Sequence, residues 1–66
     1  MNWQQVRTNW RDVSKQFHAR WGKLTDADLK AIDGRRAELV NRLQRLYALD
    51  KAKAEKEAKN FVKTLH

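Results

Sequence analysis

The chain has 66 residues and no cysteine, and its 15 Lys and Arg against 8 Asp and Glu give a net charge of +7. The length predicts a single domain over residues 1–66. The lack of cysteine excludes disulfides, thiolate metal sites and cysteine nucleophiles. No apolar run approaches the ~20 residues of a membrane-spanning helix, so we expect no integral membrane segment. The positive charge favours anionic partners, or it serves solubility alone.

The first predicted helix runs from Gln4 to Trp21. Asn2 is its expected N-cap, with Gln5 as the reciprocal partner in a capping box. Gly22 is expected to end the helix in the left-handed conformation that glycine tolerates best. At about 100° per residue, the apolar side chains fall on one narrow stripe: Trp3, Val6, Trp10, Val13, Phe17 and Trp21.

A short second helix is predicted over Asp26–Ile32, with Thr25 as N-cap and Asp28 completing a weaker form of the capping box. An Asp-Gly pair then stops this helix. The third helix is predicted over Arg35–Tyr47, and a pair between Glu38 and Arg42 stabilises it. Its apolar face consists of Leu39, Val40, Leu43, Leu46 and Tyr47.

The fourth helix is predicted over Lys51–Thr64, with Asp50 as its N-cap. Between Tyr47 and Asp50 there is no glycine or proline, so the alternative is three helices with the last two fused. We prefer separate helices, because one long rod leaves the terminal apolar residues less to pack against. Strand signals are absent, and the chain is therefore predicted to be a small all-α domain. The inner face of the last helix carries Ala54, Ala58, Phe61, Val62 and Leu65, and its outer face carries Lys56, Lys59 and Lys63.

The run from Trp21 to Leu29, WGKLTDADL, resembles the CsbD-like family of small bacterial stress-response proteins. The resemblance covers most of the chain, from about Asn2 to Phe61. It implies that the four helices form two α-hairpins packed across each other. It also implies a cytoplasmic protein induced in general stress, with no established biochemical activity to carry over. Other positions that carry it are Met1, Trp3, Asn9, Trp10, Ile32, Gly34, Arg36, Leu39, Val40, Arg45, Leu46, Tyr47, Ala54, Glu55 and Lys56.

Three positions depart from the family pattern, because Ser14, Asn41 and Ala48 stand where glycine is common. Ala48 matters most. An alanine forced into the left-handed region costs about 1 kcal/mol, so the turn between the third and fourth helices is expected to differ here. The chain is also more basic than is usual for the family.

Two arginines at the start of the third helix, Arg35 and Arg36, oppose the helix dipole and are not placed for local helix stability. A short helix, a turn and a helix with a basic start are also typical of a helix-turn-helix DNA reader. Arg42 and Arg45 extend this basic face. These four arginines are the candidate nucleic-acid-binding residues, with phosphate contacts and little sequence preference. The plain alternative is an exposed charged surface.

The aromatic stripe of the first helix is interpreted as bundle core, with its tryptophans largely buried. A membrane-surface helix or a helix docked in a partner's groove has the same pattern. No catalytic, cofactor-binding or metal-binding residue is predicted. His18 and His66 lie far apart in the sequence, and Asp26 and Asp28 are explained by their place at a helix N-terminus.

These observations lead to three hypotheses. The first is a non-catalytic stress-induced interaction or protective protein, monomeric or weakly associating, that acts through its surface without a fixed small ligand; an unknown protein is one candidate partner. The second is a non-specific nucleic-acid-binding module, and the third is a peripheral binder of anionic membranes.

Overall fold

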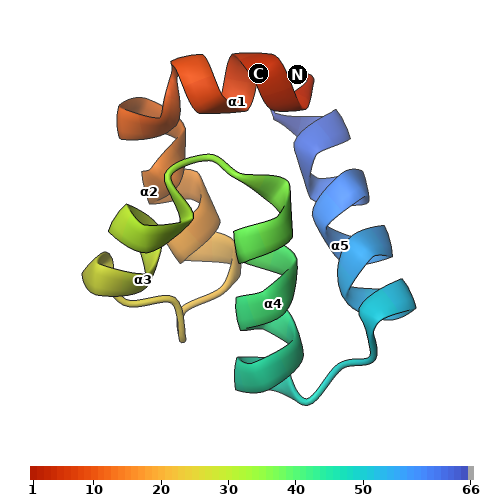
Figure 1. Cartoon of the computed structure of the whole chain (residues 1–66). Coiled ribbons are helices and arrows are strands. Elements are labelled where there is room, and N and C mark those ends of the chain that lie inside the picture. The colour runs from red at the N-terminus through yellow and green to blue at the C-terminus, as the bar shows by residue number, and fades with distance from the viewer. Residues whose placement is uncertain (66) are drawn as a thin grey trace.

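The computed structural model describes residues 1–65, which form five α-helices and no strand. The all-α class predicted from the sequence is confirmed. Figure 1 shows α4 and α5 side by side, running in opposite directions, with α1 across one end of the molecule. The helices are α1 (Trp3–Thr8), α2 (Trp10–Arg20), α3 (Asp26–Ile32), α4 (Arg36–Tyr47) and α5 (Lys51–Thr64).

The first predicted helix is divided at Asn9, where the chain turns sharply from α1 into α2 (Figure 1). Asn9 leaves helical geometry, with φ −106° and ψ 21°. Its side-chain Nδ2 donates to the Gln5 carbonyl at 2.9 Å, and the Thr8 hydroxyl donates to the Gln4 carbonyl at 2.9 Å. Asn and Thr side chains that bond nearby carbonyls compete with the helix and bend it. The expected single helix from Gln4 to Trp21 is therefore two helices.

Of the two glycines, Gly34 lies where the sequence predicted a helix stop, whereas Gly22 does not adopt the expected left-handed conformation. Gly22 does not adopt a positive φ, and α2 ends at Arg20, with Trp21 outside helical geometry at φ −125° and ψ 86°. Gly34 has φ +75°, and a Cβ atom on it would lie 2.7 Å from the Cα of Arg7. Gly34 therefore provides both a left-handed turn between α3 and α4 and the close approach of α1.

The helix caps follow the sequence closely. The capping box of Asn2 and Gln5 is present, and so is that of Thr25 and Asp28. The Asp50 side chain accepts a hydrogen bond from the Lys53 backbone N–H at 2.7 Å. These caps satisfy backbone N–H groups that have no partner inside their own helix.

The turn between α4 and α5 separates the two helices, so the fused alternative is wrong. Ala48 ends α4 with φ 53° and ψ 42°, in the left-handed region. The alanine therefore adopts the conformation that glycine would favour, and the turn keeps a left-handed residue at this position at some cost in strain.

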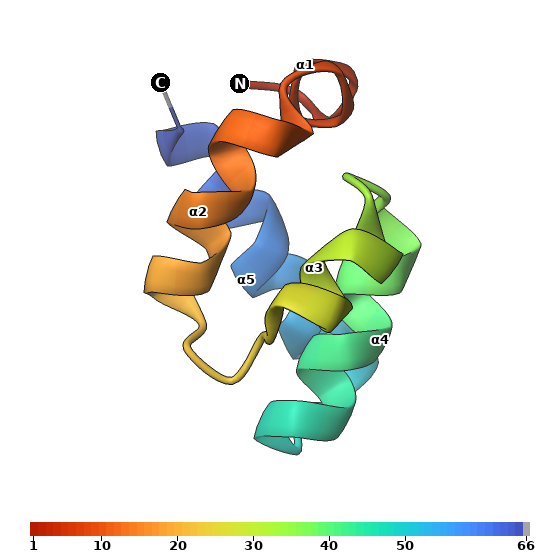
Figure 2. The same ribbon diagram turned by 90° about the vertical axis from the view of Figure 1, so that its left-hand side faces the viewer.

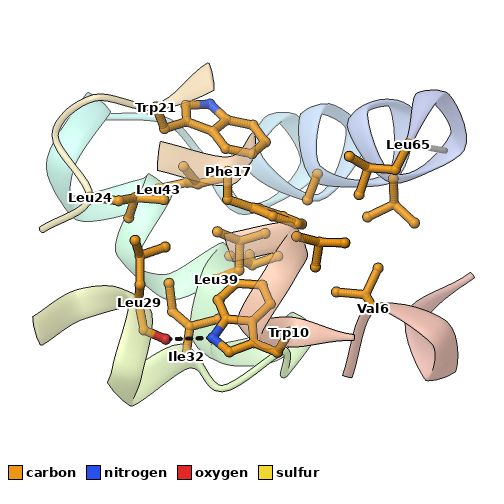
Figure 3. Packing of buried hydrophobic residues seen from close by; sticks show 14 of the residues in the cluster. Val6, Trp10, Phe17, Trp21, Leu24, Leu29, Ile32, Leu39, Leu43 and Leu65 are labelled. Atoms are coloured by element: carbon orange, nitrogen blue, oxygen red, sulfur yellow. Dashed lines mark hydrogen bonds between the residues drawn. The ribbon is translucent and has the colours of Figure 1, made fainter. Parts of the chain in front are cut away.

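One apolar core joins all five helices, and Figure 3 shows its packing. Phe17 lies at its centre, with ring centroids 5.0 Å from Trp10, 5.9 Å from Trp21 and 4.9 Å from Phe61. The Trp10 indole N–H donates to the Leu29 carbonyl at 2.9 Å, which fastens α2 to α3 (Figure 3). Trp10 and Trp21 are buried as predicted, whereas Trp3 is only half-buried at the edge of the core.

The two ends of the described chain meet. Figure 2 shows the N-terminus of α1 beside the end of α5. The Met1 ammonium donates to the Leu65 carbonyl at 3.4 Å. α1 therefore lies close to the C-terminal end of α5, and the start of the chain borders the surface described below.

Candidate functional site

Arg35, the first predicted nucleic-acid contact, is bonded to the preceding helix. Its Nε donates to the Ile32 carbonyl at 3.3 Å, and its Nη2 donates to the Ala31 carbonyl at 2.9 Å. A cation at a helix C-terminus complements the dipole there. The Arg35 guanidinium opposes the dipole of α4, but it stabilises the C-terminal end of α3. This contact explains why an arginine stands between the two helices.

Arg36 faces α5. Its Nη2 lies 2.9 Å from Oε2 of Glu55, and the Arg36 side chain remains 56% exposed. Glu55 is also 4.0 Å from the Lys51 ammonium on its own helix. The carboxylate therefore holds α4 and α5 together while leaving much of the guanidinium open to solvent.

Arg42 faces α3 and is mostly covered, with 17% of its side chain exposed. Its Nε lies 3.3 Å from Oδ1 of Asp28, and its Nη1 donates to Glu38 at 3.2 Å. The predicted pair between Glu38 and Arg42 is confirmed. The pairing with Asp28 could not be seen in the spacing, because it joins two helices.

The Asp28 carboxylate takes part in the N-terminal cap of α3 and also pairs with Arg42 on α4. The backbone N–H of Thr25 donates to its carboxylate at 3.0 Å, and so does the Thr25 hydroxyl at 3.0 Å. The backbone N–H of Thr25 lowers the pKa of Asp28 most, and the Thr25 hydroxyl and Arg42 lower it further against partial desolvation. The ionised carboxylate is therefore the form that the fold stabilises.

Arg45 lies exposed in the last turn of α4. It comes nine positions after Arg36, which places the two about 180° apart around the helix. Arg42 points to α3 and Arg36 to α5, so the four arginines do not share one face. Three of them have structural partners, and of these partners the sequence pattern showed only Glu38, which pairs with Arg42.

The histidines show no metal site in the described part of the chain. His18 is exposed, with its Nδ1 2.7 Å from the Leu24 carbonyl, and His66 lies outside the described residues. Within residues 1–65, no three His, Cys, Asp or Glu side chains are grouped so that they could hold a metal ion. Across the same residues, no helix has the length and apolar character needed to cross a membrane.

The strongest candidate site is a hollow of about 560 Å³ where α1, α4 and α5 meet. Trp3 borders it from α1 and Arg36 from α4. The α5 side carries Ala52, Glu55, Lys56 and Lys59. The outer lysine face of α5 was visible in the sequence. The sequence placed Trp3 on the apolar stripe of the first helix, with bundle core as the preferred interpretation. The bend at Asn9 sets the direction of α1, and Trp3 lies on the same lining as Lys56 and Lys59.

The fold and its surface define a small all-α protein with an apolar core and charged side chains at the surface. The chain is similar to a UPF0337 protein of Protochlamydia amoebophila, 43% identical over 61 residues that cover 92% of each chain. A UPF0337 protein of Pectobacterium atrosepticum is 44% identical over 61 residues, covering 92% of this chain and 88% of the relative. UPF0337 protein YjbJ of Escherichia coli is 40% identical over 57 residues, covering 86% and 83%.

No family model and no solved structure matches the chain. The identity and coverage of the relatives are sufficient to assign the family. The chain belongs to the UPF0337 family, the CsbD-like family that its sequence resembles.

Proposed function

We propose that this protein is a non-catalytic bacterial stress-response protein that acts in the cytoplasm, as a monomer, through its surface. The observation that carries the proposal is the division between core and surface. The buried side chains of the described chain are all apolar, and the charged side chains are half-buried or exposed. This division supports a role that the surface performs through contacts with another molecule. The resemblance to the CsbD-like family supports the stress-response role.

The stress-response role is tested by deleting the gene in the source bacterium. Survival after osmotic or ethanol stress is compared between the wild type, the deletion strain and the deletion strain carrying the gene on a plasmid. We expect the deletion strain to survive less well and the plasmid to restore survival. Equal survival of all three strains, with no rise in the protein under stress, would contradict the proposal.

The monomeric state has a direct measurement. No large apolar side chain in residues 1–65 is fully exposed, so the described surface offers little apolar area for self-association. Sedimentation equilibrium should give the 7.9 kDa mass of one chain. A concentration-dependent rise to twice that mass would overturn this part of the proposal.

A further inference from the structure

Two adjoining hollows give the molecule one continuous basic surface. The hollow beside Trp3 meets a second one of about 390 Å³ between α4 and α5, and both are bordered by Arg36 and Glu55. Lys51 borders the second hollow, and Lys56 and Lys59 border the first. We call the surface formed by these five residues and Trp3 the basic hollow.

The charge of the basic hollow differs from that of the other hollows. Four cations face one carboxylate there, which leaves a net formal charge of +3. Three other hollows have balanced or acidic linings: Arg7 with Asp33, Arg20 with Glu57, and Lys30 with Asp26 and Asp33. A large part of the chain's excess charge is therefore gathered on the α4 and α5 side of the molecule. Such a concentration of one sign attracts an anionic ligand.

Two lysines of the basic hollow, Lys56 and Lys59, are free to make such contacts, whereas Lys51 lies 4.0 Å from Glu55. Lys56 and Lys59 are exposed, and within residues 1–65 neither has a carboxylate at ion-pair distance. They lie three residues apart on α5, so they project from the same side of the helix. This contrasts with Arg35 and Arg42, whose guanidinium groups are bonded within the fold.

Trp3 adds an aromatic group to the basic hollow. Its ring packs against the edge of the core and also borders the hollow, so it is held in place while part of it remains accessible. A fixed aromatic side chain beside cations suits an unpaired nucleobase, which stacks on the ring while its phosphates meet the cations. A duplex presents its phosphates but keeps its base faces stacked inside.

We propose that the basic hollow binds single-stranded nucleic acid, with Lys56, Lys59 and Arg36 contacting phosphates and Trp3 stacking on a base. Binding to an acidic membrane fits the surface less well, because no large apolar side chain of residues 1–65 is exposed for insertion into lipid. This assignment rests on the surface-acting role proposed above and names its ligand class.

The test is a fluorescence-anisotropy titration of the full chain with a labelled mixed-sequence DNA single strand, and with the same sequence as a duplex, at about 50 and about 200 mM salt. We expect tighter binding to the single strand and a clear loss of affinity at the higher salt. K56Q/K59Q should weaken single-strand binding about tenfold and lower the salt slope by about 1.4, at about 0.7 per phosphate contact. The control K15Q/K30Q removes the same charge from exposed positions outside the basic hollow and should change affinity less than about twofold.

The aromatic contact has its own variant. Trp3→Leu keeps an apolar side chain against the core and removes the stacking ring, so single-strand affinity should fall about tenfold while duplex affinity stays within about twofold. Circular dichroism and thermal unfolding show whether each variant is folded.

Equal losses of single-strand affinity in K56Q/K59Q and K15Q/K30Q would overturn the basic hollow as the binding site. Equal binding of single strand and duplex would overturn the stacking role of Trp3. Binding to phosphatidylglycerol vesicles without binding to the single strand would overturn the ligand class in favour of a membrane surface. Each of these results leaves the survival phenotype of the deletion strain intact, so failure of the site is distinguishable from failure of the proposed function.

Discussion

The junction between α3 and α4 and the basic hollow both carry positive charge, but they use it differently. At the junction, Arg35 bonds two carbonyls and Arg42 meets two carboxylates, so these cations hold the helices in place. In the basic hollow, Lys56 and Lys59 are exposed and free of such partners within residues 1–65. The net charge of a small protein therefore says little about its function until each cation's partner is known.

The largest expected effect lies at the junction itself. Gly34→Ala places a Cβ atom 2.7 Å from the Cα of Arg7 and puts alanine at φ +75°, so α1 must move. We expect a loss of about 2–4 kcal/mol in the free energy of unfolding, measured by urea denaturation. Gly22→Ala is the matched control, because nothing lies within 4 Å of its Cβ position, and its change should stay below about 1 kcal/mol. Equal losses at the two glycines would contradict the close approach of α1.

The next prediction compares an arginine that is paired within the fold, Arg42, with an exposed arginine on the same helix, Arg45. Arg42→Gln removes the pairing with Asp28 and Glu38 and should cost about 1–2 kcal/mol in urea denaturation. Arg45→Gln, on the exposed side of the same helix, should change stability by less than about 0.5 kcal/mol. The interpretation of the junction would be wrong if both variants were as stable as the wild type.

A substitution in the turn between α4 and α5 is expected to stabilise the fold. Ala48 has φ 53°, and Ala48→Gly relieves the strain of a left-handed alanine at the cost of a more flexible unfolded chain. We expect a gain of about 0.5–1 kcal/mol, seen as a higher urea midpoint. A destabilised variant would show that the turn favours alanine for a reason other than its backbone angles.

A smaller effect concerns pH at the junction. The fold lowers the pKa of Asp28, so its ionised form contributes stability above the unfolded pKa of about 3.9. This contribution is lost as the pH falls through the lower folded value. Asp28→Asn should therefore be less stable than the wild type near neutral pH, and its stability should fall less on acidification. Urea midpoints from about pH 6 to about pH 2 measure the stability near neutral pH and its fall on acidification. Asp12→Asn is the exposed control. Parallel pH curves for the wild type and Asp28→Asn would contradict the assignment.

Most of the helical pattern was readable in the sequence, because caps and apolar spacing are local. Thr25, Asp28 and Asp50 cap their helices as predicted, and Phe17 lies in the core. The bend at Asn9 was missed, since it depends on side-chain bonds to carbonyls that a helical spacing pattern does not register.

The candidate site was less predictable. The spacing of Arg36 and Arg42 indicated a basic face, but their carboxylate partners, Glu55 and Asp28, lie on other helices. The lysines of α5 were recognised as an outer face. That Trp3 meets them depends on how α1 crosses the end of the fold, which no local pattern contains.

The most direct test of the central comparison sets two double variants side by side. Arg35→Gln with Arg42→Gln, and Lys56→Gln with Lys59→Gln, remove the same charge from the junction and from the basic hollow. Single-strand affinity and urea midpoint are measured for both at about 50 mM salt, at a temperature where both are folded. We predict that the arginine variant loses stability and keeps its affinity within about twofold, whereas the lysine variant keeps its midpoint and loses affinity about tenfold. Equal loss of affinity in both variants would show that net charge alone governs binding, and would contradict the division between the two regions.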